Sequence, residues 1–241
     1  MKISIVVPAF NEEKLIGPTL ASIAEASGKF AQHGWVTEVI VCDNNSTDAT
    51  ADVARAAGAK VVFEPVNQIG RARNTGAAAA TGDWLVFVDA DSRPSPALFG
   101  EVAEQIASGK CLGGGCTVRL DERHFIADCG TGLWNILSRL LDWAAGAFIY
   151  CEAGAFRAVG GFNQELFASE EIDLSKRLKK LARLTGKRMV ILHRNPLLTS
   201  ARKMRLYSRG DLARFLGRAI FSHRATITSR EACAPWYDGR R

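Results

Sequence analysis

Short apolar runs alternate with helix-forming segments through the first 108 residues, and this alternation constrains the fold more than any other feature. The apolar, β-rich runs occupy residues 3–7, 38–42, 60–63 and 84–88. Helical spacing follows them at residues 12–26, 46–57, 70–81 and 94–108. Because strands that alternate with helices form parallel sheets covered on both faces, we predict an α/β fold with a mostly parallel sheet.

The rhythm changes after about residue 110. Three consecutive glycines at residues 113–115 interrupt the pattern, and the sequence then predicts short strands at residues 117–120 and 189–192. Helical spacing recurs at residues 133–145, 171–184 and 211–223. We therefore expect one domain over residues 1–200, divided near residue 110, followed by a basic helical extension over residues 201–241.

Positive charge is concentrated in that extension. Residues 201–241 hold ten Arg or Lys against three acids, a net charge of +7, whereas the whole chain carries +6. This asymmetry favours an anionic partner such as a diphosphate or a membrane surface, although a solvated arginine-rich face explains it equally well. Because nothing else indicates nucleic-acid binding, we expect none.

No uncharged apolar run approaches the roughly 18 residues that a spanning helix needs. The apolar run at residues 3–7 is too short for a signal peptide. We therefore expect a cytoplasmic protein, with peripheral membrane contact through the basic C-terminus left open.

Polar side chains follow three of the predicted strands, at the edge of the sheet where ligands bind in α/β proteins. Glu12 follows the first strand, Asp43 the second, and Asp89 and Asp91 the fourth. Each loop alone is explained by turns and helix caps, but three on one edge indicate a site. Two carboxylates this close together suit Mg²⁺ or Mn²⁺, provided that a bound diphosphate supplies further oxygen ligands.

Two common nucleotide-binding motifs do not occur where the fold would require them. No Gly-x-Gly-x-x-Gly follows the first strand, and no Gly-Lys-Ser/Thr phosphate loop occurs. The sequence therefore disfavours a hydride-transfer enzyme and a P-loop NTPase.

Seven short motifs occur in an order that matches a known family. They are VVPAFNEE (6–13), VCDNNSTD (41–48), ARNTG (72–76), ATGD (80–83), FVDAD (87–91), GGF (160–162) and SEEIDL (169–174). With this set, which covers about residues 1–180, the chain resembles glycosyltransferase family 2, a group of inverting enzymes with the nucleotide-sugar-binding fold called GT-A. The resemblance implies a Rossmann-like sheet flanked by helices, a nucleotide-binding half at about 1–110 and an acceptor half at about 111–200.

The resemblance also implies roles for residues of the donor site. Residues of the first two strand ends would contact the nucleotide, whose base would be uracil or guanine: Pro8, Ala9, Glu12, Asp43 and Asn44. Asn44 stands where the family usually has a second acid. Arg71 or Arg73 would lie near the nucleotide or diphosphate.

The resemblance further implies that Asp89 and Asp91 hold the ribose and the metal-bound diphosphate. A basic residue after the last strand closes over the diphosphate in similar enzymes, and Arg202 and Lys203 are the candidates. His193 is a further candidate metal ligand, although a lone histidine at a strand end is more often structural.

The family's usual Glu-Asp pair aligns with Glu170 and Glu171. Glu171 would then be the general base that removes a proton from the acceptor hydroxyl, with Asp173 as the alternative. We expect an inverting transferase that uses a UDP- or GDP-sugar with Mg²⁺ or Mn²⁺ and acts on a sugar, lipid-linked or small-molecule acceptor. The alternatives are a sugar nucleotidyltransferase and a non-catalytic nucleotide-sugar-binding protein.

Overall fold

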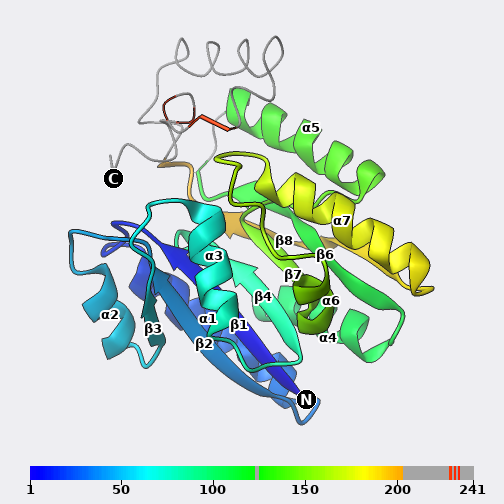
Figure 1. The fold of residues 1–241 in the computed structure, drawn as a ribbon, viewed down its shortest axis with the longest axis horizontal. Helices are drawn as coiled ribbons and strands as arrows, with labels where there is room; N and C mark the ends of the chain where they lie inside the picture. Colours follow the sequence, from blue (N-terminus) through cyan, green and yellow to red (C-terminus); the bar gives the residue numbers. More distant parts are fainter. Residues whose placement is uncertain (123–124, 203–227, 230, 232, 234–241) are drawn as a thin grey trace.

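The computed structural model describes residues 1–122, 125–202, 228, 229, 231 and 233. These residues form an eight-stranded mixed sheet with helices on both faces (Figure 1). The strand order is β3-β2-β1-β4-β7-β6-β8-β5. Within the described ranges, no helix combines the length and the apolarity that crossing a membrane requires.

The first four strands are parallel, as predicted. They are β1 (Lys2–Ala9), β2 (Val36–Asp43), β3 (Lys60–Phe63) and β4 (Trp84–Val88). Ala9 at the end of β1 pairs in register with Asp43 at the end of β2. The polar loops that follow β1 and β2 therefore start side by side at the same edge of the sheet.

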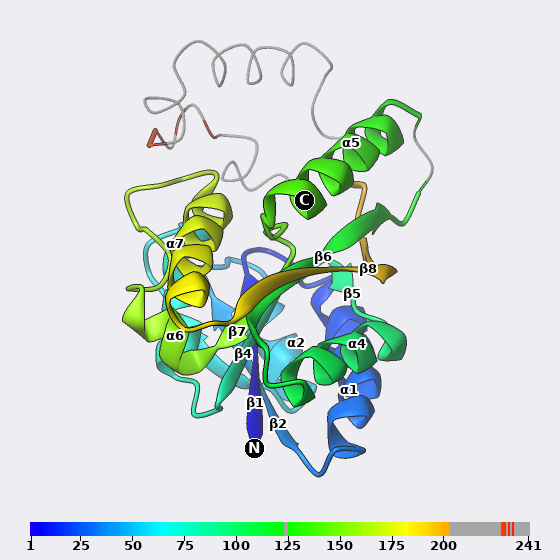
Figure 2. The same cartoon turned by 90° about the vertical axis from the view of Figure 1, so that its right-hand side faces the viewer.

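Alternate side chains of these strands enter two separate hydrophobic cores. Ile5 and Val7 contribute to the core formed with α1 (Ile16–Ala31), α2 (Thr50–Ala56) and α4 (Pro96–Ala107). Val6 and Phe87 contribute to the core formed with α3 (Ile69–Ala78), α6 (Ala153–Ala158) and α7 (Glu170–Leu184). This strand period of two explains why helices cover both faces, with α1 and α4 on one side and α6 and α7 on the other (Figure 2).

The second half completes the sheet with strands of mixed direction. They are β5 (Ser92–Arg93), β6 (Cys111–Leu120), β7 (Phe148–Glu152) and β8 (Arg188–Thr199). β7 runs antiparallel between β4 and β6, and β8 is parallel to β6. Sequence patterns did not indicate β7, and they placed the start of β6 six residues too late.

The glycine run does not interrupt the sheet, so that prediction was wrong. Gly113, Gly114 and Gly115 lie inside β6. A β carbon on Gly114 would lie 1.8 Å from the carbonyl oxygen of Val190, and one on Gly113 would lie 2.6 Å from that of Tyr150. The glycines are needed here because neighbouring backbone approaches too closely for any side chain.

Helix α5 (Phe125–Leu141) begins and ends earlier than the predicted helix at residues 133–145. Asp142 adopts a left-handed φ of 54°, which ends the helix. Ala144 and Ala145 then continue the apolar pattern as buried, non-helical residues. The predicted helix at residues 211–223 lies outside the described residues.

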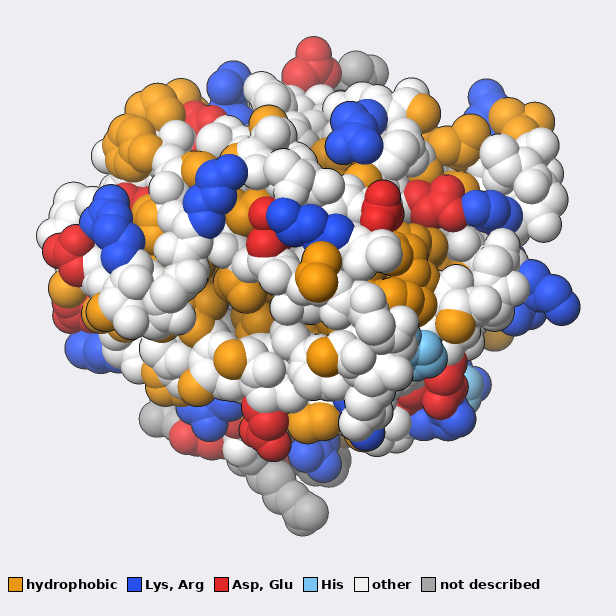
Figure 3. Space-filling view, turned by 90° about the horizontal axis from the view of Figure 1, so that it is seen from below, with side chains coloured by type: hydrophobic (Ala, Val, Ile, Leu, Met, Phe, Trp, Pro, Cys, Tyr) orange, Lys and Arg blue, Asp and Glu red, His pale blue; other side chains and the backbone are white. Residues whose placement is uncertain are grey.

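The lower face of the molecule lies where β1 begins, away from the polar strand ends. Its described Lys, Arg, Asp and Glu side chains are intermixed with apolar ones (Figure 3). Charges of one sign do not gather on this face.

Replacing Gly114 by Ala should destabilise the fold, because the added methyl group would overlap the backbone of β8. We expect the free energy of unfolding to fall by about 3 kcal/mol, measured by urea denaturation. Gly28→Ala is the matched control: Gly28 lies in α1 with nothing within 4 Å of an added β carbon, so this variant should gain roughly 0.5–1 kcal/mol. Equal stability of the two variants would contradict the close-approach argument.

Candidate active site

The loops after β1 and β2 form one wall of the site and are joined by hydrogen bonds. The backbone N–H of Asn11 donates to Ser46 Oγ at 3.0 Å, and that of Glu12 donates to Thr50 Oγ1 at 2.7 Å. The backbone N–H of Thr47 donates in return to Asn11 Oδ1 at 2.8 Å. These short polar side chains, which turns and caps commonly use, hold the two loops in a fixed relation.

Asp43 ends β2 in this wall, and Asn44 follows it. One carboxylate oxygen of Asp43 accepts the backbone N–H of Ser46 at 3.0 Å. The buried Asn44 side chain donates to the carbonyl oxygens of Glu64 and Val66 and accepts the N–H of Gln68. Asn44 therefore holds the loop before α3, and its predicted contact with a nucleotide base stays a prediction.

Arg73 occupies the centre of the site and is almost completely buried, with 1% of its side chain exposed. Its Nη1 donates to Glu170 Oε1 at 2.7 Å, and its Nη2 donates to Asp89 Oδ1 at 2.9 Å and to the carbonyl oxygen of Gly146 at 2.7 Å. The guanidinium carbon lies 5.2 Å from the ring centroid of Phe162. Arg73 thus joins Asp89 to Glu170, and its predicted place near the nucleotide or diphosphate stays a prediction.

Arg71 lies two residues before Arg73, in the first turn of α3. Its Nε donates to Gln68 Oε1 at 3.1 Å, and the residue is half-buried. Its predicted place near the nucleotide or diphosphate stays a prediction.

Two adjacent glutamates begin α7. Glu170 is buried and bound to Arg73. Glu171 lies against Gly146, where an added β carbon would be 3.6 Å from the Glu171 carboxyl carbon. Burial, together with the negative charge of Glu170, raises the pKa of Glu171 to about 8. Glu171 can therefore exchange a proton near neutral pH, as a general base must.

Asp173 lies one turn further along the same helix and pairs with Arg177. Arg177 Nη2 lies 2.6 Å from Asp173 Oδ2 in a partly exposed i,i+4 pair. The structure therefore does not bring Asp173 into the Arg73 cluster.

Arg202 connects the end of β8 to the loops after β1 and β4. Its Nη2 donates to both carboxylate oxygens of Glu12, at 2.7 and 2.9 Å, and lies 4.0 Å from Asp91 Oδ2. The backbone N–H of Ser200 donates to the carbonyl oxygen of Asp91 at 3.2 Å. Three predicted residues that are far apart in the sequence thus meet at one place.

Two other predicted residues are not brought to this place. Lys203 lies outside the described residues. His193 is exposed at an irregularity of β8 between Leu192 and Leu197, beside the neighbouring Arg194 that pairs with α4. The structure does not bring His193 to Asp89 and Asp91.

The available metal ligands of the site are carboxylates. Among the described residues, no three His, Cys, Asp or Glu side chains gather as a metal site. Asp89 and Asp91 offer hard oxygen ligands, with 21% and 10% of their side chains exposed. These residues fit a hard divalent cation that takes its remaining ligands from a bound anion and water.

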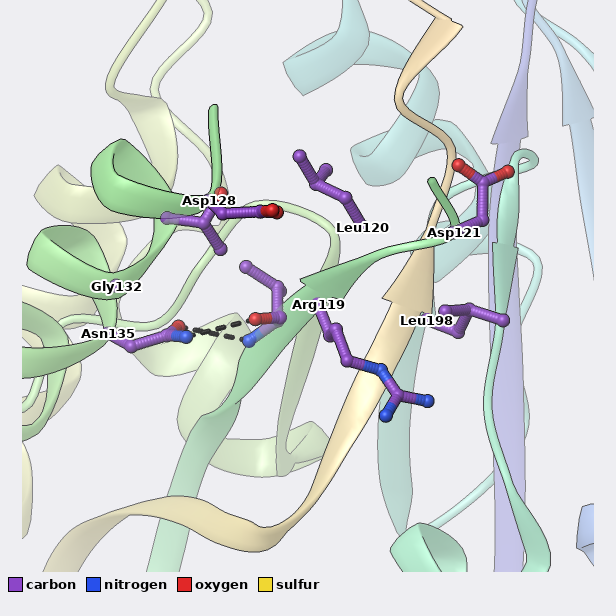
Figure 4. Close-up of a pocket in the computed structure, with 9 residues that line it drawn as sticks. Arg119, Leu120, Asp121, Asp128, Gly132, Asn135 and Leu198 are labelled. Atoms are coloured by element: carbon purple, nitrogen blue, oxygen red, sulfur yellow. Dashed lines mark hydrogen bonds between the residues drawn. The ribbon is translucent and has the colours of Figure 1, made fainter. Parts of the chain in front are cut away.

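A cleft of about 570 Å³ adjoins the site, between the end of β6 and α5 (Figure 4). Its lining includes Arg119, Asp121, Asp128 and Asn135. Asp121 Oδ1 also accepts the backbone N–H of Ala201 at 2.8 Å, next to Arg202. Sequence reasoning missed this cleft and the carbonyl of Gly146, because both are formed by the packing of segments in the second half of the chain.

The sequence profile of Glycosyl transferase family 2 matches residues 4–157, and the chain belongs to this family. The chain is 40% identical over 97 residues to glucosyl-3-phosphoglycerate synthase of Mycolicibacterium smegmatis, a match that covers 37% of this chain and 30% of that protein. It is 36% identical over 96 residues to 4,4'-diaponeurosporenoate glycosyltransferase of Staphylococcus haemolyticus, a match that covers 37% of this chain and 24% of that protein. The chain thus matches less than a third of the length of either relative.

Two solved structures share the fold. The mannosyltransferase PcManGT from Pyrobaculum calidifontis, in complex with GDP-Man and Mn²⁺, aligns with a TM-score of 0.67 at 19% identity, over 98% of this chain and 67% of that one. Glucosyl-3-phosphoglycerate synthase from Mycobacterium tuberculosis, in complex with Mn²⁺, UDP and glucosyl-3-phosphoglycerate, aligns with a TM-score of 0.63 at 22% identity. The alignment covers 97% of this chain and 80% of that one. These likenesses confirm the predicted GT-A fold.

Replacing Arg73 by Gln should destabilise the protein strongly, because it leaves buried carboxylates without their cation. We expect a loss of about 3–5 kcal/mol at neutral pH, measured by urea denaturation. Arg55→Gln, which removes an exposed ion pair with Asp52, should stay within about 0.5 kcal/mol of the unmodified protein. A comparable loss in both variants would contradict the central role of Arg73.

Proposed function

We propose that the protein is an inverting glycosyltransferase that moves a sugar from a UDP- or GDP-sugar to an acceptor hydroxyl, with Mg²⁺ or Mn²⁺. The observation that carries the proposal is the bridge made by Arg73, which joins the donor-side acid Asp89 to the carboxyl pair at Glu170. On this proposal, one guanidinium would hold a leaving-group site and a proton acceptor on adjacent sides of the same crevice.

The donor nucleotide would lie along the wall formed after β1 and β2. Its contacts are assigned to Pro8, Ala9, Glu12, Asp43 and Arg71, with Asn44 supporting the wall. Ala9 and Asp43 are neighbours in the sheet register, and the hydrogen bonds between the two loops keep this wall rigid. A rigid wall fits the recognition of a planar base and a ribose, because little ordering of the protein is then needed on binding.

The diphosphate would lie over Asp89 and Asp91, with the cation between them and the phosphate oxygens. Such a cation, when bound, neutralises the charge on the departing diphosphate. Support comes from the donor set of two hard carboxylates and from the Mn²⁺ present in the two structures with this fold. Asp89 is kept in place by Arg73.

Arg202 would contact the diphosphate, with Lys203 as a second cation. Arginine suits phosphate because its planar fork donates two parallel hydrogen bonds. Arg202 already donates to Glu12 and approaches Asp91. If a phosphate oxygen replaced one of these carboxylates, Arg202 would still be paired with a negative charge. The guanidinium of Arg202 would therefore lose little solvation when the diphosphate binds.

Glu171 would act as the base. Its ionised carboxylate takes the proton of the acceptor hydroxyl while the hydroxyl oxygen bonds to the anomeric carbon, and the bond from that carbon to the diphosphate oxygen breaks. Glu170 is less suited to this task, because one of its carboxylate oxygens already accepts a hydrogen bond from Arg73. Its negative charge raises the pKa of Glu171, which strengthens Glu171 as a proton acceptor.

The acceptor would enter from the cleft between β6 and α5. The cleft reaches Asp121, whose contact with Ala201 places it beside the Arg202 segment. Hydrogen-bonding side chains such as Asn135 and Thr131 line it together with Leu120 and Leu198. This mixed lining suits a hydroxyl-bearing acceptor, and its identity as a sugar, a lipid-linked or a small molecule is left open.

The rate of sugar transfer should rise with pH and level off above about pH 8, because Glu171 must lose its proton to act as the base. Glu171→Gln should lower kcat by about 10²–10⁴-fold and remove this rise. The measurement is the initial rate of UDP or GDP release. It is taken from pH 6 to pH 9, a range of about three units that includes the pKa of Glu171.

A folding control separates lost chemistry from lost structure. The pKa of Glu171 in the folded protein lies above its unfolded value, so its contribution to stability is full at acid pH and is lost as pH rises through about 8. Glu171→Gln, which resembles the protonated acid, should therefore equal or exceed the unmodified protein in thermal stability at alkaline pH. Full activity of this stable variant would reject Glu171 as the base.

Asp91→Ala should abolish metal-dependent hydrolysis of the donor, because the diphosphate then loses its shared cation. We expect a loss of at least about 10²-fold, comparable to the loss when EDTA is added to the unmodified protein. Asp52→Ala, at an exposed position of α2, serves as the control and should retain activity. Donor hydrolysis that survives both the Asp91 substitution and EDTA would exclude a metal role for this site.

A further inference from the structure

Helix α5 exposes a continuous aliphatic stripe. Its members recur at i, i+3, i+4, i+7 and i+8, with exposed fractions between 37% and 72%: Leu133, Ile136, Leu137, Leu140 and Leu141. A helix of a globular domain normally turns such a stripe towards the core. Here the stripe faces outwards, and contiguous exposed apolar surface of this kind marks an interaction site.

A different face of α5 makes the contacts with the rest of the fold. The side chain of Asn135 bonds to both the N–H and the carbonyl oxygen of Val118 in β6, at 3.0 and 2.9 Å. Ser138 is buried and donates to the carbonyl oxygen of Trp143. The orientation of the helix is therefore set by polar contacts, and the aliphatic stripe is left for a partner.

Positive charge lies beside the stripe. The C-terminal end of α5 is joined to α7 by Lys179, which pairs with Asp142 at 2.7 Å, and by Lys176, whose Nζ lies 5.1 Å from the Trp143 ring centroid. Lys176, Lys180 and Arg183 are exposed at i, i+4 and i+7 of α7. The segment that follows α5 therefore contacts α7, and the exposed cations of α7 lie on a helix next to the C-terminal end of α5.

More positive charge enters from the C-terminal part of the chain. Ala201 is bound to Asp121 at the edge of the cleft that α5 lines. From this point to residue 241 the chain carries ten Arg or Lys and three acids.

We propose that α5 binds the surface of an anionic lipid bilayer, with its aliphatic stripe inserted at the level of the headgroups. Aliphatic residues on one helix face, with Lys and Arg around them, form the pattern of interfacial membrane helices. Each basic residue near an anionic membrane adds attraction. A second copy of the chain fits this surface less well, since two-fold pairing of the stripes would bring two basic α7 faces together.

If the chain transfers a sugar as proposed above, a membrane contact through α5 also places the acceptor cleft. The cleft residues Asp128, Gly132 and Asn135 lie on another face of the same helix. A helix with its side chains is about 10–12 Å across. An α5 helix seated on a bilayer would therefore hold the proposed acceptor cleft about one helix diameter from the headgroups.

The test is co-flotation of the full chain with vesicles, either of phosphatidylcholine alone or of equal parts phosphatidylcholine and phosphatidylglycerol. We expect binding to the anionic vesicles. Ile136→Glu combined with Leu140→Glu should lower the bound-to-free ratio by at least roughly tenfold. The matched control is Val36→Glu with Phe63→Glu, two exposed apolar positions on β2 and β3, which should bind as the unmodified chain does.

A second pair of variants tests the electrostatic part. Lys180→Glu with Arg183→Glu should weaken binding to anionic vesicles, and Lys110→Glu, at an exposed position before β6, should not. The proposal is overturned if the unmodified chain does not float with anionic vesicles, or if the Ile136/Leu140 variant floats equally well. It is also overturned if light scattering shows a dimer that this variant dissociates, because self-association would then explain the stripe.

Donor hydrolysis by the same preparations distinguishes the two proposals. The Ile136/Leu140 variant should retain hydrolysis while losing vesicle binding, which supports the lipid contact and shows that the variant is folded. Vesicle binding without donor hydrolysis in the unmodified chain would reject the proposed transferase and leave the lipid contact supported.

Discussion

The site depends on the buried guanidinium of Arg73. Three structural elements meet at it: α3 supplies the arginine, the end of β4 supplies Asp89, and the start of α7 supplies Glu170. Burying a charge without a partner costs several kcal/mol, so the arrangement is stable only when these elements are docked together. The contact that completes the fold is thus also the one that assembles the site.

The same cluster affects the pKa of Glu171. Burial, together with the negative charge of the neighbouring Glu170, raises the pKa of Glu171 to about 8. On the other side of the crevice, Arg202 balances Glu12 and Asp91, so each carboxylate cluster has its own arginine.

Local patterns were sufficient for the first half of the fold. Strands β1 to β4 alternate with their helices in the predicted order because each helix buries a stripe of its own sequence against the sheet. The later strands could not be found in this way. The three glycines of β6 predicted an interruption of the pattern. Residues 148–152 of β7 follow an apolar helical pattern, and they are recognised as a strand only by their pairing with β4 and β6.

What the sequence determined by itself was the set of residue types at the strand ends: Asp43 after β2, Asp89 and Asp91 after β4, and the glutamate pair at the start of α7. Only the tertiary structure decided their partners. Arg73 and Glu170 are 97 residues apart, and Arg202 and Glu12 are 190 apart. Backbone propensity and side-chain period act over one element at a time, whereas burial and charge pairing depend on which elements meet in space. The sequence could therefore name the acids of the site, and the packed fold alone showed which arginine holds each of them.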